Sequence, residues 1–301
     1  MSNSLKTLGW NSLLLGAVAG IWGGALYQGV GWLLAPLQAP ALTTLATGMA
    51  LGLGLCSLLA SVDDLYNRFW RRASRSALAG GALGLAAGGV GFGLVWLILA
   101  AFGATGGIVS GFGVAHWLAV PLLMGLFGGA AGLGSCFSAS GLQSILQKGL
   151  RRGLTGLAAG VALGLPLTGL LALAGGQGWL FQAAFAAWGA LVALALYWGE
   201  KKTARRWLRV LTGPGEDTFY PLIGNSVTLG KTEFNDIPLT SYQEIFPFHC
   251  QLRWETDHYK IVDREQGGMV LVNYRQIQEQ DLKHGDLVKL GTALLQYGEA
   301  S

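Results

Sequence analysis

Residues 282–297 read LKHGDLVKLGTALLQY, and this stretch decides the fold of the C-terminal part of the chain. It contains two short alternating runs, DLVKL and ALLQY, of the kind that forms half-buried strands. Earlier runs have the same character: SVTLGK, HCQLRWE, HYKIVD and MVLVN, punctuated by Gly, Asn and Asp. Several short strands at this spacing predict a small all-β sandwich over residues 218–301.

The chain before about residue 200 has a different composition, dominated by Gly, Ala, Leu and Trp. Long apolar runs predict membrane spans, because about 30 Å of hydrocarbon needs about 20 helical residues. We identify six candidate spans, at residues 9–35, 41–62, 76–103, 113–134, 153–175 and 180–199. We therefore expect an α-helical membrane domain over residues 1–200 and a basic juxtamembrane linker over residues 201–217, before the sandwich. The stretch KKTARRWLR in that linker is predicted to lie on the membrane as an amphipathic helix.

The basic residues are distributed unevenly. Up to Arg209, thirteen residues are Lys or Arg and three are Asp or Glu, whereas from Leu211 onward the numbers are seven and thirteen. The connections APLQAP, GATGGIVSGFG and GGQGW contain no Lys or Arg, so all thirteen lie on the other side of the predicted spans. The positive-inside rule then predicts a multi-pass protein of the plasma (inner) membrane, with the N terminus and the C-terminal domain in the cytoplasm. Because these residues adjoin apolar spans, we expect membrane lipids as partners and no nucleic acid.

Glycine recurs at every fourth position in the odd spans, which places it on one helical face. These glycines are Gly16, Gly20, Gly24, Gly80, Gly84, Gly88, Gly156, Gly160 and Gly164. The even spans repeat as well, because GMALGLGLC (48–56) matches GGAAGLGSC (128–136), with a faded third copy from Gly189 onward. The pattern predicts an internal repeat: three Gly-rich two-helix hairpins.

The glycine faces have two interpretations. Tight packing of the odd helices around a pseudo-threefold axis is favoured, because glycine lets helix backbones approach closely. The alternative is a glycine zipper that lines a pore or joins subunits into a homo-oligomer. Transport of ions usually leaves ionisable residues within the membrane. The interiors of the predicted spans contain none, which disfavours a proton-coupled pump.

Catalysis is not expected. Cys56, Cys136 and Cys250 form no CxxC pair, and no His/Cys cluster has metal-ligand spacing, so we expect neither metal nor cofactor. Paired carboxylates and nucleophile–base patterns are missing as well, so the chain is not predicted to be an enzyme. Cys56 and Cys136 occupy equivalent places near span ends, where small-residue packing is favoured over palmitoylation.

The C-terminal segment resembles the forkhead-associated (FHA) domain family over about 80 residues. The matching stretches are VTLGK (227–231), NDIPL (235–239), His249 with CQLRWE, YKIVD (259–263), VLVN (270–273) and LKHGDLVKLGTALLQY (282–297). The resemblance implies a β-sandwich that reads phosphothreonine peptides through its loops. It also implies that His249 is a structural brace for those loops and not a catalytic or metal-binding residue.

The binding loops depart from the family pattern. The family's phosphate-contacting arginine falls on Lys231, which keeps the charge but loses the bidentate fork. Its serine falls on Phe246, its following basic position on Pro247, and its peptide-binding asparagine on Gly268. Each lost charge-assisted hydrogen bond is worth about 1.5–3 kcal/mol. We therefore favour a phosphate-independent contact over phosphothreonine binding.

Three exposed apolar side chains are expected in these loops. Phe246, Phe248 and Met269 are predicted to form a patch that binds a protein partner, unless Phe248 belongs to the core. The favoured function is thus a multi-pass membrane scaffold or adaptor that recruits a cytoplasmic protein or peptide, in signalling or envelope assembly. A channel or transporter with a regulatory FHA-like domain is the first alternative. An oligomeric membrane-shaping protein is the second.

Overall fold

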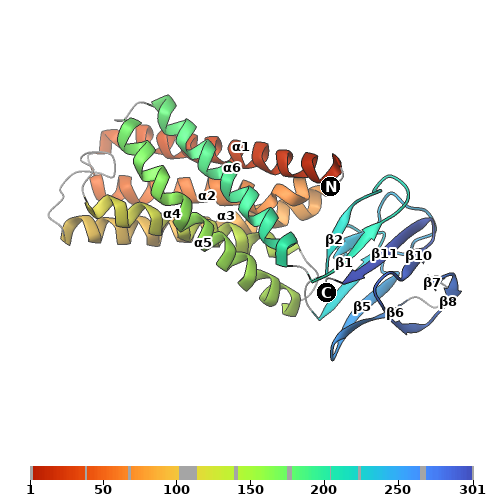
Figure 1. Cartoon of the computed structure of the whole chain (residues 1–301). Coiled ribbons are helices and arrows are strands. Elements are labelled where there is room, and N and C mark those ends of the chain that lie inside the picture. Colours follow the sequence, from red (N-terminus) through yellow and green to blue (C-terminus); the bar gives the residue numbers. More distant parts are fainter. Residues whose placement is uncertain are drawn as a thin grey trace. The chain divides into compact units, whose positions relative to one another are not determined.

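The computed structural model describes residues 3–37, 39–66, 69–101, 114–138, 142–174, 178–203, 205–222, 225–264 and 269–299. Contacts divide the chain into two compact units, one built mainly of apolar helices and one that contains all the strands (Figure 1). Each unit has its own cluster of buried apolar side chains. The predicted change of architecture along the chain is therefore confirmed.

Within these described residues, six helices are long and apolar enough to cross a membrane. They are α1 (Asn3–Leu34), α2 (Pro40–Tyr66), α3 (Trp70–Ala101), α4 (Val114–Gly134), α5 (Leu142–Ala174) and α6 (Gly178–Thr203). Short 3-10 turns follow two of them, at Ala35–Leu37 and Ser135–Ser138. Each helix overlaps one predicted span, and α2 and α6 extend beyond both ends of theirs.

The glycine faces of the odd helices lie against even helices. A Cβ atom added at Gly84 of α3 would collide with the carbonyl oxygen of Gly52 in α2. One added at Gly156 of α5 would collide with that of Gly128 in α4. Gly80 and Gly88 approach α2, and Gly160 and Gly164 approach α4, in the same way. These contacts leave no space for a side chain at the interface.

The third pair joins the last helix to the first. Gly16 of α1 approaches Gly189 of α6, Gly20 approaches Phe185, and Gly24 approaches the side chain of Gln182. The helices are thus paired as α2/α3, α4/α5 and α6/α1. The predicted packing of odd helices on one another is wrong in this respect, since the even helices contribute small residues of their own. Because these faces are occupied within the chain, a homo-oligomer would need another surface.

The cysteines of the helices are also part of the packing. Cys56 in α2 is buried, and its thiol lies 3.3 Å from the carbonyl oxygen of Phe127 in α4. Cys136 is buried beside Gly132. Their burial agrees with small-residue packing and leaves neither thiol accessible for palmitoylation.

Charged side chains link the helices at the C-terminal end of α2. Asp64 accepts a hydrogen bond of 2.7 Å from Ser76 and lies 3.3 Å from Arg72, both in α3. Asp63 pairs with Arg152 of α5 at 3.0 Å. Two of the basic residues that we expected to face lipid headgroups therefore make ion pairs within the chain.

The second unit is a sandwich of two mostly antiparallel sheets (Figure 1). The first sheet has the order β2-β1-β11-β10-β7-β8 and the second the order β4-β3-β5-β6-β9. The strands are β1 (Arg206–Val210), β2 (Phe219–Pro221), β3 (Ser226–Gly230), β4 (Ile237–Pro238), β5 (Cys250–Glu255), β6 (His258–Asp263), β7 (Val270–Val272), β8 (Arg275–Gln276), β9 (Glu279–Asp281), β10 (Leu287–Leu290) and β11 (Ala293–Glu299). Leu229, Leu252, Val288 and Leu295 are fully buried between the sheets.

The sandwich begins earlier than the sequence predicted. Residues 206–210 form β1, paired with both β2 and β11, and do not continue the helix or form a linker. Leu208 and Val210 point into the core, whereas Arg206 pairs with Glu299 at 2.6 Å and lies over the ring of Trp254 at 4.0 Å. The basic run obscured this strand, because Arg206 opens it and Arg209 alternates outward between the buried Leu208 and Val210.

Candidate functional site

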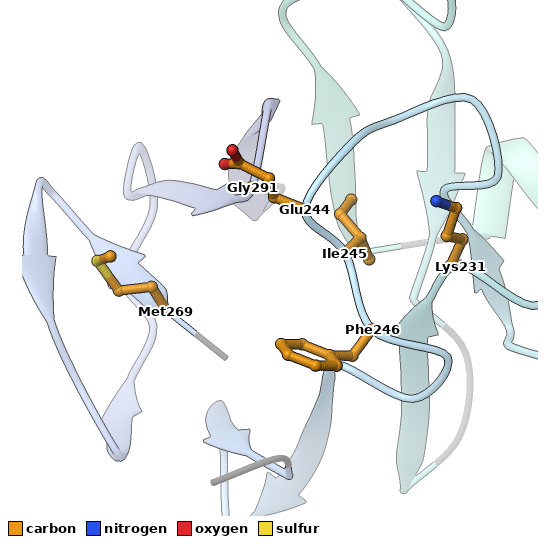
Figure 2. Close-up of a pocket in the computed structure, with 6 residues that line it drawn as sticks. All are labelled: Lys231, Glu244, Ile245, Phe246, Met269 and Gly291. Carbon is orange, nitrogen blue, oxygen red and sulfur yellow. The ribbon is translucent and has the colours of Figure 1, made fainter. Parts of the chain in front are cut away.

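A pocket of about 470 Å³ opens between the loops at one end of the sandwich (Figure 2). Its lining residues come from four separate segments of the chain and are Lys231, Glu244, Ile245, Phe246, Met269 and Gly291. Lys231 follows β3, residues 244–246 lie between β4 and β5, Met269 precedes β7, and Gly291 lies in the turn between β10 and β11. The fold therefore gathers residues that are up to 60 positions apart in the sequence, from 231 to 291.

Three predicted binding residues meet in this pocket: Lys231, Phe246 and Met269. Phe246 and Met269 are 40% and 58% exposed, so both side chains offer apolar surface to a ligand. Pro247 is exposed next to Phe246, and Phe248 is 48% exposed and not part of the core, although neither lines the pocket. Gly268 lies outside the described residues. Glu244 and Gly291 were not predicted from the sequence.

His249 lies beneath the loop that carries Phe246. Its ring is 1% exposed, and its Nδ1 accepts a hydrogen bond of 3.1 Å from the backbone N–H of Phe246. The His249 N–H in turn donates to the carbonyl oxygen of Leu229 in β3. These bonds connect the tip of the loop to the sheet, which is what a brace requires.

Asn235 joins this loop to its neighbour, and the sequence analysis assigned it no role. Its buried Nδ2 donates to the carbonyl oxygen of Pro247 at 2.7 Å, and to the carbonyl and hydroxyl oxygens of Thr232 at 3.1 and 2.7 Å. The Lys231 N–H also donates to the carbonyl oxygen of Phe246 at 2.9 Å. The two loops are therefore held as one unit. The sequence signal for this role was an asparagine placed directly after the turn residues that follow a strand.

The other end of the same loop is fixed as well. The Tyr242 hydroxyl donates to the carbonyl oxygen of Thr212 at 2.9 Å and accepts from the N–H of Gly215 at 3.1 Å. The Gln243 N–H donates to the Thr292 hydroxyl at 3.0 Å. Glu244 then adopts a left-handed backbone conformation with φ of 58°. Such a conformation persists in a non-glycine residue only where its surroundings hold it.

The chemistry of the pocket is that of binding. It presents one ammonium group, one carboxylate and three apolar side chains. Within the described part of the chain, Lys231 and Glu244 make no ion pair, so both charges face solvent or a ligand. Over the same residues, the side chains form no group of His, Cys, Asp and Glu that could hold a metal ion.

Residues 209–301 match the family model described as "Inner membrane component of T3SS, cytoplasmic domain". No curated protein matches the chain. Among solved structures, the FHA domain of the CT664 protein from Chlamydia trachomatis is 25% identical, with 32% of this chain and 99% of that one covered and a TM-score of 0.30. The cytoplasmic domain of the sorting platform protein PscD from P. aeruginosa is 16% identical, with 31% and 79% covered and a TM-score of 0.29.

The family match begins inside β1, in agreement with the strand that extends the sandwich toward residue 206. It covers the sandwich and not the six helices. The C-terminal unit of this membrane protein is an FHA-like domain.

Proposed function

We propose that this protein is a multi-pass scaffold of the inner membrane, without enzymatic activity, whose FHA-like domain recruits a protein partner independently of phosphate. The description of the matching family as an inner-membrane component supports the location. The six apolar helices supply the anchor. Recruitment in envelope assembly or signalling is the role that this combination serves best.

One observation carries the proposal: Phe246 is held at the surface of a loop that is fixed at both ends. An apolar side chain that is exposed by a flexible loop could collapse onto the protein. Here His249, Asn235 and Tyr242 hold the loop by hydrogen bonds. A rigid, exposed aromatic residue beside a pocket is the usual anchor of a protein interface, because little conformational entropy is lost on binding.

The test uses the full chain in its native membrane. A photo-crosslinking amino acid is placed at residue 248, which is exposed beside the pocket, and crosslinked products are compared with and without phosphatase treatment. We expect a discrete crosslinked partner, unchanged by phosphatase and reduced at least about fivefold by Phe246→Ser. The same probe at Lys283 gives the control. Lys283 precedes β10, whereas the pocket residue Gly291 follows this strand. A crosslink that needs phosphate, or that ignores Phe246→Ser, would contradict the proposal.

A further inference from the structure

We infer that the pocket selects an unphosphorylated peptide segment with a defined order of charges: an acidic residue, an apolar residue and a basic residue, each facing its complement. The inference rests on the proposed function, because it concerns what the same pocket binds. It follows from the placement of the two charges, from the hydrogen bonds already made by the loops, and from the apolar surface between them.

The two charges of the pocket lie on opposite sides of its apolar floor. Figure 2 shows the Lys231 ammonium on one side of Ile245 and the Glu244 carboxylate on the other, near Gly291. Phe246 lies below Ile245 in this view, and Met269 lies across the gap from both. The net charge of the lining is therefore zero, with a positive charge at one side of the pocket and a negative charge at the other. A ligand of matching polarity gains from both ends, whereas one of reversed polarity meets two like charges.

A phosphate group fits this lining poorly. It carries about −1.5 to −2 charges near neutral pH, and Lys231 offers one ammonium point charge against it. The Glu244 carboxylate lies in the same pocket and repels a dianion. A ligand carboxylate, with a single negative charge, can pair with Lys231 while an adjoining base pairs with Glu244.

Three backbone donors of the loops are committed within the protein. The Phe246 N–H donates to His249 Nδ1, the Lys231 N–H to the carbonyl oxygen of Phe246, and the Thr232 N–H to that of Pro247. Phosphate sites in loops commonly use such N–H groups as additional donors. Their use inside the protein removes that contribution and leaves side chains to determine what binds.

The apolar floor accounts for the central residue of the segment. Phe246 and Met269 are exposed, whereas Ile245, which also lines the pocket, is buried. An apolar side chain placed here removes surface of both aromatic and thioether groups from water. The charged flanks then determine the direction in which the segment lies across the pocket.

The experiment is a selection from a library of random seven-residue peptides, carried out on the full chain in lipid nanodiscs. Two baits are compared, the natural protein and the double variant Lys231→Glu with Glu244→Lys. We expect the natural protein to enrich peptides in which one order of acid and base flanks an apolar residue, and the double variant to enrich the opposite order. The control Lys283→Glu changes a charge beyond the far end of β10 and should leave the selected order unchanged.

Affinities of the selected peptides give the second measurement. Lys231→Glu alone should weaken the peptide chosen by the natural protein by about tenfold, because an attractive pair becomes a repulsive one. A matched peptide pair that differs only in threonine and phosphothreonine should differ by less than about twofold. Thermal unfolding of each variant shows whether the exposed substitutions leave the sandwich folded.

The outcomes separate the inference from the proposed function. If Phe246→Ser abolishes binding but charge reversal leaves the selected order unchanged, the charge-order inference is wrong while the recruiting surface stands. If Phe246→Ser leaves binding intact, the proposed site itself is wrong. A phosphothreonine peptide that binds a hundredfold more tightly than its threonine counterpart would overturn both.

Discussion

His249 connects the binding loop to the sheet beneath it, and its replacement tests whether the loop depends on that connection. We expect His249→Ala to lower the free energy of unfolding of the sandwich by about 2–3 kcal/mol, because the Phe246 N–H loses its acceptor and a cavity remains. Hydrogen exchange measured by mass spectrometry on the full chain in detergent should show faster exchange at the Phe246 amide. In His249→Asn, which keeps an acceptor, the exchange rate of the Phe246 amide should lie between those of the natural protein and His249→Ala. Unchanged exchange in His249→Ala would remove the bracing role.

His258 gives the sandwich a dependence on pH. Its Nδ1 lies 2.8 Å from Asp257 and its Nε2 3.2 Å from Asp281. The hydrogen bond to Asp257, and then the charge of Asp281, raise the pKa of His258 above its usual 6.5. Below pH 6.5 the protonated ring contributes its full stabilisation, and the contribution is lost as the pH rises through the raised value.

The measurement compares thermal unfolding of the sandwich at several pH values from about 6 to 9. We expect the melting temperature to fall over this range, and His258→Gln to lack the part of that fall that belongs to the imidazole. Lys260 lies 2.9 Å from Glu255 and 3.9 Å from Asp281. It stays charged over this pH range, so its ion pairs add no pH dependence to the melting temperature. Equal pH profiles for the two proteins would contradict the assignment.

Single residues of the site could be predicted only where a pattern carried them. Lys231 and Phe246 occupy positions defined by the strands around them, so the resemblance located them. Glu244 and Gly291 lie in the pocket because two turns meet there: a side chain at Gly291 would collide with the carbonyl oxygen of Gln243. Contacts of this kind, between turns far apart in the chain, leave no periodic signal in the sequence.

At the scale of elements, two glycines of α3 offer a matched comparison. A Cβ at Gly84 would collide with the backbone of α2, whereas a Cβ at Gly93 meets nothing within 4 Å. We expect Gly84→Ala to destabilise the helical unit by about 1–3 kcal/mol, since the helices must separate. Gly93→Ala should change stability by less than about 0.5 kcal/mol.

The buried cysteines of the helical unit provide the readout. Cys56 and Cys136 become accessible on unfolding, so a thiol-reactive fluorescent dye reports the transition in detergent. Cys250 lies in the sandwich, and replacing it by serine or alanine in all the compared proteins restricts the signal to the helices. Equal melting temperatures for Gly84→Ala and Gly93→Ala would contradict the close helix contact.

Helices with long uniform apolar patterns were predictable, whereas very short strands and a strand within a basic run were not. The six helices follow from apolar runs of about 20 residues, which few other structures can produce. β1 was missed because Arg206 and Arg209 continue the basic run that ends α6. Strands as short as β4 and β8 contain two residues each, too few for alternation to be visible.

For the whole molecule, the distribution of basic residues predicts how the chain crosses the membrane. We expect alkaline phosphatase inserted within residues 35–40 to be active outside the cytoplasm, and a fluorescent protein fused after Ser301 to fluoresce inside it. Phosphatase inserted within residues 145–150, in a basic connection, should be inactive and serves as the control. The opposite pattern of activity would place the sandwich outside the cytoplasm and remove the proposed recruitment.

The pairing of α6 with α1 affects how the protein folds during its synthesis and membrane insertion. Gly16 and Gly20 of α1 lie against α6, so α1 enters the membrane long before the helix that it contacts has been translated. At about 5–20 residues per second, the interval is on the order of ten to thirty seconds. During that time lipid or the insertion machinery covers the face of α1 that carries Gly16 and Gly20. A chain halted before α6 therefore leaves the Gly16 and Gly20 face of α1 without the helix that it contacts in the finished fold.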